Sequence, residues 1–332
     1  MDRRIAPLPR PLRPITIAHR GASSYRPEHT LAAYELAITL GADFIEPDLV
    51  STADGVLVAR HESNIARTTD IAEHPEYAGR HTTKTIDGAQ VTGWFCEDFT
   101  FDELRTLRAI ERLPDLRPAN RMFDGDFLVP SFEEILDLAA AHSTPERSIG
   151  LYPETKHPTY FRSLGLPLEP ALLRDLDSRG QNHRDAKIFI QSFEVDNLRV
   201  LRRVTDVPLI QLVEADGHPA GGSAIDYQAM TTPAGLAQIA TYADGIGPDK
   251  HIVHPGMVDD AHAVGLQVHP WTFRAENCFL APSHRSSEKN EEHGDLAHEI
   301  RTFLSYGIDG IFCDFADIAV ATINDLALIQ SQ

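Results

Sequence analysis

The feature that most restricts the fold of this sequence is the regular alternation of two kinds of segment. A short apolar run rich in β-branched residues is followed by turn residues, and then by an amphipathic stretch that ends near a glycine. Strands that alternate with helices favour parallel pairing, because each parallel connection needs a crossover of about a dozen residues. We predict strands at 14–19, 43–49, 56–61, 149–154, 187–191, 208–213, 244–247, 267–271 and 310–313.

Helix signals lie between most of these strands. Ser131 followed by Glu134 has the spacing of a capping box, and Thr232 followed by Pro233 predicts another helix start. A further helical stretch is expected at 101–113, within an otherwise irregular and polar region. Helix ends are predicted where a glycine follows the amphipathic stretch, at Gly41, Gly180, Gly265 and Gly307.

One of the strand segments does not fit the alternation. The linker before 56–61 is too short for a crossover helix, and its Asp54-Gly55 pair is typical of a β-hairpin. We therefore interpret 56–61 as an antiparallel arm. The other strands predict an α/β fold, a (β/α)8 TIM barrel with a small inserted subdomain after the hairpin arm. The expected domain is a single barrel over 14–325, with the insertion 62–130 as a small capping subdomain.

Composition excludes several classes of protein. The 332-residue chain has 49 Asp and Glu against 30 Lys and Arg, a formal charge of −19. A surface this acidic repels nucleic acid, so no nucleic-acid partner is expected. No run approaches the roughly 20 apolar residues of a transmembrane helix, and the first residues lack the apolar segment of a secretory signal. We expect a cytoplasmic protein as the sequence stands, or a periplasmic or secreted one if a leader was removed. The oligomeric state is not indicated.

Functional groups of such barrels gather at the carboxyl ends of the strands. Glu46 and Asp48 lie two residues apart on one predicted strand and therefore face the same side. Their carboxylates repel each other unless a cation or a proton lies between them, and Glu154 would add a third oxygen donor from the neighbouring strand. Such a set suits one divalent metal ion, Ca²⁺ or Mg²⁺. The alternative is that these side chains form a solvated strand end.

Four basic side chains are expected at the same rim. His19 ends the first strand and His61 ends the hairpin arm, so the two imidazoles could act as base and acid. Arg20 and Lys156 could hold an anionic phosphate near the carboxylates. The alternatives are structural or exposed histidines, and cations that only pair with the neighbouring glutamates. Aromatic side chains at two further strand ends, Phe193 and Trp271, would be either apolar walls for a ligand or buried core residues.

These residues, in this order, resemble the glycerophosphodiester phosphodiesterase family. The matching motifs extend over about 14–320 and are His19-Arg20-Gly21, Pro27-Glu28-His29-Thr30, Glu46-x-Asp48, Asp54-Gly55 with His61, Glu154-Thr155-Lys156, Gln191-Ser192-Phe193, His269-Pro270-Trp271-Thr272 and Cys313-Asp314-Phe315. The last motif departs from the family's usual Thr-Asp-x-Pro. The long insertion after His61 looks like the subdomain of bacterial, periplasmic-type members.

The resemblance implies an activity and a role for each residue. The activity is metal-dependent hydrolysis of a glycerophosphodiester, a small-molecule substrate, to sn-glycerol 3-phosphate and an alcohol. The implied route uses the glycerol 2-hydroxyl as internal nucleophile, followed by attack of water on a cyclic phosphate. The implied roles are metal ligands (Glu46, Asp48 and Glu154), an acid–base pair (His19 and His61) and substrate-binding residues (Arg20, Lys156, Gln191, Phe193 and Trp271).

Two other functions fit the same barrel. A phospholipase-D-like lyase would convert lysolipids or sphingolipids to cyclic phosphates. It needs an exposed apolar or basic loop that docks on membranes, whereas the insertions here are polar and acidic. A non-catalytic barrel would only bind a phosphodiester or a partner protein, and its function would not depend on His19 or His61.

Overall fold

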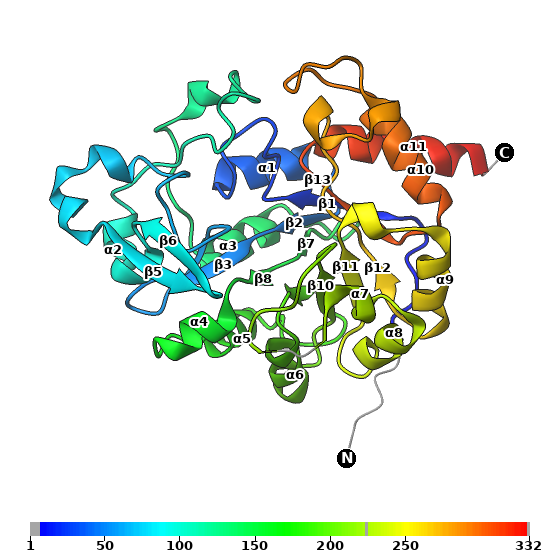
Figure 1. Cartoon of the computed structure of the whole chain (residues 1–332), viewed down its shortest axis with the longest axis horizontal. Coiled ribbons are helices and arrows are strands. Elements are labelled where there is room, and N and C mark those ends of the chain that lie inside the picture. The colour runs from blue at the N-terminus through cyan, green and yellow to red at the C-terminus, as the bar shows by residue number, and fades with distance from the viewer. Residues whose placement is uncertain (1–6, 223–224, 331–332) are drawn as a thin grey trace.

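Strand pairing in the computed structural model of the chain, which describes residues 7–222 and 225–330, closes into a ring (Figure 1). All the pairs between neighbouring strands of this ring are parallel. The bridge between Phe273 and Cys313 joins the last two strands and closes it. In order, the strands are β1 (Ile15–His19), β2 (Phe44–Glu46) with β3 (Asp48–Ser51), β7 (Gly150–Leu151) with β8 (Glu154–Thr155), β9 (Ile190–Ser192), β10 (Leu209–Val213), β11 (Gly245–Pro248), β12 (Gln267–Val268) and β13 (Gly310–Cys313).

Two positions of the ring are strands interrupted by a proline. Pro47 separates β2 from β3, and Pro153 lies between β7 and β8. Proline has no N–H to donate to a ladder, so the strand assignment breaks there. The backbone hydrogen bonds resume at once, because the N–H of Glu154 donates to the carbonyl of Pro47. Counted in this way, the described residues contain eight parallel strand positions, as a (β/α)8 barrel requires.

Helices surround the ring on its outer side (Figure 1). The longer ones are α1 (Leu31–Thr39), α3 (Phe132–Ala141), α5 (Leu168–Ser178), α6 (Val195–Val204), α8 (Pro233–Ile239), α9 (Pro255–Ala263), α10 (Leu296–Ser305) and α11 (Ala316–Gln330). Short helices are α4 (Pro158–Ser163) and α7 (Tyr227–Met230). The largest apolar cluster fills the space between ring and helices, while a smaller one, Ile17, Phe44, Tyr152, Ile210 and Phe312, fills the ring itself. The interior of the barrel is therefore a packed core rather than a pore.

The predicted helix signals are confirmed. Ser131 and Glu134 form both hydrogen bonds of a capping box at the start of α3. Thr232 accepts from the N–H of Gly235 at the start of α8, with Pro233 at the first helical position. The glycines predicted at helix ends have positive φ, a conformation that side chains with a Cβ rarely adopt: Gly41, Gly180, Gly265 and Gly307.

The hairpin arm is also confirmed. β4 (Leu57–Ala59) pairs antiparallel with β3, with Leu49 opposite Ala59. The chain then enters the long insertion, which contains the hairpin of β5 (Thr82–Ile86) and β6 (Ala89–Gly93). Its helical elements are short: η1 (Ile71–Glu73), η2 (Pro75–Arg80), η3 (Cys96–Asp98), α2 (Phe101–Leu104) and η4 (Asn120–Phe123).

The helix predicted over 101–113 is wrong in length, because α2 ends at Leu104. The chain beyond it is held by tertiary hydrogen bonds instead. The N–H of Arg108 donates to the side chain of Asp70, and the N–H of Ile110 donates to the carbonyl of Thr68. These bonds to an earlier part of the insertion replace the helical ones.

Candidate active site

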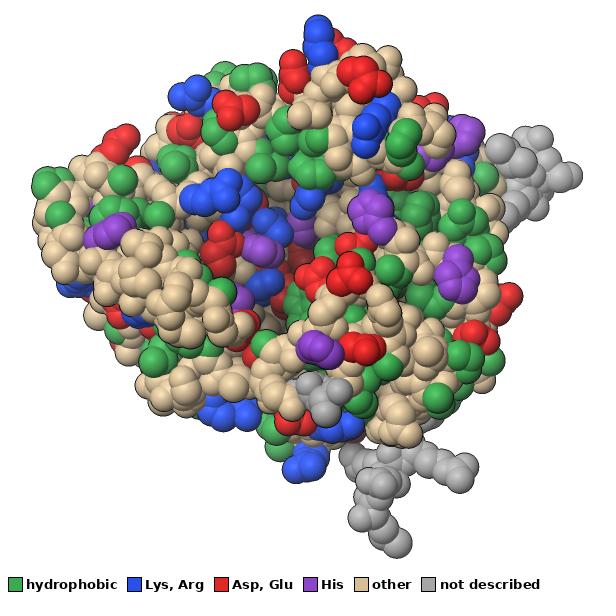
Figure 2. Space-filling view, in the orientation of Figure 1, with side chains coloured by type: hydrophobic (Ala, Val, Ile, Leu, Met, Phe, Trp, Pro, Cys, Tyr) green, Lys and Arg blue, Asp and Glu red, His purple; other side chains and the backbone are tan. Residues whose placement is uncertain are grey.

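A pocket of about 880 Å³ opens at the carboxyl ends of the strands. Figure 2 shows this hollow near the centre of the molecule, with basic, acidic and histidine side chains gathered in it. The structure brings all the predicted site residues to its wall: His19, Arg20, Glu46, Asp48, His61, Glu154, Lys156, Gln191, Phe193 and Trp271. The reason is topological, because parallel strands in a closed ring end at one rim.

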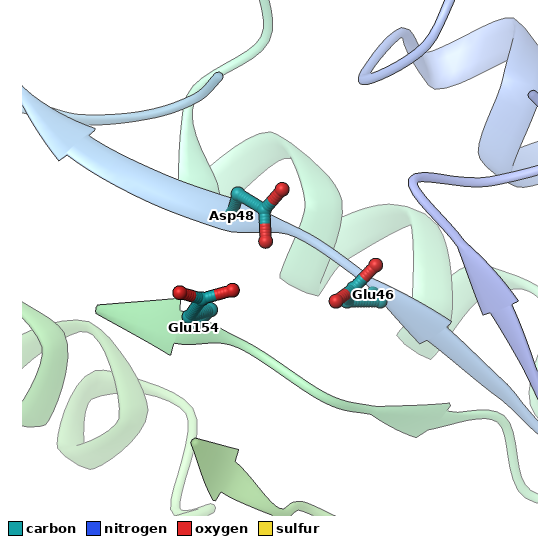
Figure 3. Close-up of side chains that lie close together, drawn as sticks. All are labelled: Glu46, Asp48 and Glu154. Carbon is teal, nitrogen blue, oxygen red and sulfur yellow. The ribbon is translucent and has the colours of Figure 1, made fainter. Parts of the chain in front are cut away.

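Three buried carboxylates converge in the pocket. Glu46 and Asp48 lie on either side of Pro47, and Glu154 is the partner of Asp48 across the β3–β8 pair. One carboxylate oxygen of each lies within 4.8 Å of the others. Figure 3 shows Glu46 on β2 and Asp48 on β3, which continues from β2, with Glu154 on β8 beside them. The alternative of a solvated strand end does not apply, since all three side chains are buried.

The pKa values of these three acids reflect their burial and the repulsion between their negative charges. Burial, followed by the negative charge of Asp48, raises the pKa of Glu46 well above its ordinary value. Burial likewise raises the pKa of Glu154 to about 8, although Lys156 opposes the shift. Asp48 differs: burial alone would raise its pKa, but His29, Lys156 and His61 together outweigh burial and hold the pKa well below its ordinary value. A cation at the centre would relieve the repulsion among the three groups.

The residues present fit a hard divalent ion. All three donors are carboxylate oxygens, which suit Ca²⁺ or Mg²⁺ better than a soft metal. Asp48 Oδ1 is buried and has no hydrogen-bond partner among the described residues. An unpaired buried oxygen is costly, and a bound cation would satisfy it. The acidic triad could therefore hold a metal ion.

His19 is the last residue of β1 and is nearly buried. Its Nδ1 lies 2.6 Å from Asp314 Oδ1, and its Nε2 lies 4.0 Å from Glu46 Oε2. Burial and the charge of Arg20 lower its pKa to about 4, although Asp314 opposes this. The imidazole is therefore neutral near pH 7 and can accept a proton.

His61 follows the hairpin arm and borders the same pocket. Its Nδ1 lies 2.6 Å from Glu62 Oε2. Burial, together with the charges of Arg20 and Lys156, lowers the pKa of His61 well below its ordinary value. Both histidines thus place one ring nitrogen on a carboxylate and leave the other for a reacting group.

Arg20 and Lys156 are paired with acids, as the alternative interpretation allowed. Arg20 Nη1 donates to Glu28 at 3.0 Å, and its Nε lies 3.5 Å from Asp48. Lys156 Nζ lies 2.9 Å from Glu154 Oε1. Both cations nevertheless line the pocket, so they offset the negative charge of the triad where an anionic substrate would enter.

The remaining predicted residues complete the wall. Gln191 donates a 2.8 Å hydrogen bond to Glu46 and is fully buried. Phe193 and Trp271 meet edge to face, with ring centroids 5.9 Å apart. Both rings are only partly buried and border the pocket, so they are not simply core residues.

Several residues that contact this site had no role predicted from the sequence. His29 bonds Asp48 at 3.0 Å through Nε2, and Asp314 bonds His19. Asp314 directly follows the last strand, β13, at the rim where the sequence places it, but no role was predicted for it. Arg112 and Arg117 lie in an irregular loop of the insertion, where no sequence pattern marks them.

The fold and the acidic, histidine-flanked site define a barrel enzyme of the phosphodiesterase class, and comparison with known proteins agrees. Residues 19–318 match the model of the glycerophosphoryl diester phosphodiesterase family. A glycerophosphodiester phosphodiesterase of Arabidopsis thaliana is 35% identical over 326 residues, covering 91% of this chain and 84% of that protein. One from Bacillus subtilis is 30% identical, covering 93% and 86%. The chain belongs to the glycerophosphoryl diester phosphodiesterase family, and the prediction of this enzyme class is confirmed.

Solved structures share the fold. A phosphodiesterase from Oleispira antarctica, in complex with the product sn-glycerol-3-phosphate, aligns with a TM-score of 0.65 at 19% identity, covering 94% of this chain and 97% of that one. A glycerophosphodiester phosphodiesterase from Agrobacterium tumefaciens aligns with a TM-score of 0.60 at 20% identity, covering 92% and 99%. None of the helices in the described residues has the length and the apolar composition that crossing a membrane requires.

Proposed function

We propose that this enzyme hydrolyses glycerophosphodiesters to sn-glycerol 3-phosphate and an alcohol, using one Ca²⁺ or Mg²⁺ ion held by Glu46, Asp48 and Glu154. The observation that carries the proposal is the convergence of this buried triad with two histidines and two cations in one pocket. The product bound by the Oleispira antarctica phosphodiesterase supports the choice of substrate. When bound, the metal ion would act as a Lewis acid toward the phosphodiester.

The chain's own residues would perform the remaining chemistry. Arg20 and Lys156 would bind the phosphate oxygens and stabilise the charge that builds on them. One of His19 and His61 would take the proton of the glycerol 2-hydroxyl through Nε2 as that oxygen attacks phosphorus. The other histidine would act as an imidazolium, a form that the anionic phosphate beside it favours, and would donate its Nε2 proton to the leaving alcohol oxygen. Water would then attack the cyclic phosphate and give its proton to this now neutral histidine, while the first histidine returns its proton to the glycerol 2-oxygen. Each proton transfer is worth about 10²- to 10⁴-fold in rate.

The insertion 62–130 would cap this site within a single domain over 14–325. The β5–β6 turn supports this role, because Asp87 lines the pocket and its carboxylate lies 2.5 Å from Nδ1 of His157, which precedes α4. Phe193 and Trp271 would form the wall against the organic part of the substrate, with Gln191 behind them. The size of the insertion and its place after His61 support our proposal that the chain belongs to the bacterial periplasmic-type subgroup.

The test is an assay of glycerophosphocholine hydrolysis before and after chelation of divalent ions. We expect activity to be lost and to return when Ca²⁺ or Mg²⁺ is added, with ³¹P NMR showing glycerol 3-phosphate as the product. Activity that survives chelation would contradict the metal role. A cyclic phosphate as the final product would favour the lyase instead, and full function after His19→Ala or His61→Ala would favour a binding protein.

A further inference from the structure

Both histidines of the site have the same supporting arrangement. Each places Nδ1 on a carboxylate, and each carboxylate is in turn bound by an arginine from one short stretch of the insertion, residues 111–120. His19 contacts Asp314 at 2.6 Å, and Asp314 Oδ2 accepts from Arg117 Nη2 at 2.6 Å. The histidine ends β1, the carboxylate directly follows β13, and the arginine lies in the insertion, so the three come from distant parts of the chain.

The second arrangement is built nearby with different residues. His61 contacts Glu62 at 2.6 Å, and Glu62 accepts two hydrogen bonds from Arg112, at 2.8 and 3.0 Å. Arg112 also lies 2.7 Å from Glu28, the residue that accepts a hydrogen bond from Arg20. Arg112 is therefore linked to His61 through Glu62, and to Arg20 through Glu28.

The stretch that carries these arginines is itself fixed to the barrel. Arg117 is buried, donates to Glu276 at 2.7 Å, and donates to the backbone carbonyl of Ser23 at 3.0 Å. Asn120 donates to the same carbonyl. Ser23 follows His19 by four residues, and its hydroxyl donates to the His19 carbonyl. The loop thus holds the backbone after His19 as well as its side chain.

Both supporting carboxylates are ionised. Burial alone would raise the pKa of Glu62, but the hydrogen bonds from His61 and Arg112 outweigh it and hold the pKa below its ordinary value. Arg274, Arg117 and His19 similarly outweigh burial at Asp314, so its pKa lies well below the ordinary value. An ionised carboxylate can only accept hydrogen bonds. A histidine beside it must therefore donate from Nδ1–H, so that Nε2 can accept a proton when the ring is neutral and can donate one when the ring is an imidazolium.

The geometry points to Arg112 and Arg117 as positioning residues, which fix the Nδ1–H tautomer and the ring orientation of His61 and His19 through Glu62 and Asp314. The inference rests on the proposed function, because it gives these two histidines the acid–base roles. The insertion would then position the two histidines, in addition to its proposed role as a cap over the pocket. In the Ser-His-Asp triad a carboxylate orients the catalytic histidine in the same way, since the wrong tautomer cannot accept the proton.

The test replaces each arginine in the full chain and measures kcat, KM and the histidine tautomers. For Arg112→Met we expect kcat on glycerophosphocholine to fall by about 10- to 100-fold, with KM changed less than about twofold, as for other groups that orient a reacting residue. Arg117→Met should act in the same direction but less strongly, because Arg274 also binds Asp314 at 3.0 Å. Arg112→Lys, which keeps the charge, should recover part of the loss.

The tautomers are read from ¹H–¹⁵N correlation spectra of the imidazoles, with the signals of the two histidines identified by their loss in His61→Gln and His19→Gln. We expect the wild-type protein to show the Nδ1–H form at both, and Arg112→Met to show a mixture at His61 only. Arg105→Met is the matched control, because Arg105 lies in the same insertion but pairs with Glu134 at 3.2 Å, outside the pocket. If Arg112→Met does not fold, Glu62→Gln replaces it with a side chain of the same size.

The outcomes separate this inference from the proposed function. A wild-type protein without activity contradicts the proposed function, while the tautomer spectra still test the positioning role. Unchanged kcat in Arg112→Met, or a lower kcat with an unchanged His61 tautomer, overturns the positioning role even when the wild type is active. A fall equal to that of Arg105→Met would likewise show that the arginine acts only through general stability.

Discussion

Gln191 donates a 2.8 Å hydrogen bond to Oε1 of Glu46, although 145 residues separate the two in the chain. The other oxygen of Glu46 accepts from the backbone N–H of Arg20 at 3.0 Å. Both oxygens of this carboxylate are therefore held by donors from other positions of the ring, one on β9 and one directly after β1. Such donors orient a metal-binding carboxylate and tune its affinity.

We accordingly predict that Gln191→Leu weakens metal binding by about 10- to 100-fold, because Glu46 loses the donor that orients it. Isothermal titration of the metal-free protein with Ca²⁺ measures the change. Gln238→Leu, an exposed change on α8, is the control and should leave the affinity as in the wild type. Equal affinities in both variants would mean that the hydrogen bond does not orient the ligand.

Added Ca²⁺ or Mg²⁺ should stabilise the protein, and more at pH 8 than at pH 5.5. Binding requires ionised carboxylates, and the raised pKa values of Glu46 and Glu154 mean that protons compete with the ion at the lower pH. At an ion concentration of about 100 times Kd, the gain is about 2.7 kcal/mol, visible as a higher Tm in thermal melts. Glu154→Gln should remove most of this gain, and a gain that it leaves intact would place the ion elsewhere.

Mild acid should destabilise the fold through His269. Burial lowers the pKa of this histidine to about 4, and its Nδ1 is hydrogen-bonded to the Tyr152 hydroxyl at 2.7 Å inside the ring. As pH falls below about 6.5, the unfolded chain binds a proton at this histidine while the folded protein does not, so stability decreases until about pH 4.

The loss attributable to His269 is about 3 kcal/mol between pH 7 and pH 4. Urea unfolding at pH 7 and pH 4.5 measures it, and His269→Gln, which has no group that titrates there, should show a smaller decline than the wild type. An equal decline in the two proteins would refute the assignment to His269.

Gly150→Ala should lower the free energy of unfolding by about 1–3 kcal/mol, because its Cβ would overlap the ring of Phe44 inside the barrel. Gly79→Ala is the matched control, since a Cβ there meets nothing within 4 Å. Urea unfolding of both variants gives the comparison. Equal stabilities would show that the barrel interior yields to the extra methyl group.

The ring of strands could be predicted from sequence because each strand is a local apolar run bounded by turn residues. The division of 43–49 at Pro47 was not predicted, since strand-like residues continue on both sides of the proline. The end of α2 at Leu104 was missed for a different reason. Local propensity over 101–113 favoured a helix, and hydrogen bonds to Thr68 and Asp70 overrode it.

The same contrast holds for the site. The proximity of Glu46, Asp48 and Glu154 could be predicted, because strand order and the common rim of a barrel determine where residues at strand ends lie. The positions of Arg112 and Arg117 could not be predicted, because both residues belong to an irregular loop whose path depends on contacts with distant residues. Only the structure shows that Arg117 reaches Asp314, 197 residues further along the chain.

The contact between His19 and Asp314 joins positions 295 residues apart, and it exists only because β13 pairs with β1. Contacts of such long sequence separation form late, since the entropy lost in closing the intervening chain must first be compensated. A nascent or refolding chain would therefore gain its helices and much of its interior before it could turn over any substrate. Catalytic activity would therefore begin only when the last strand, β13, pairs with β1 and closes the barrel.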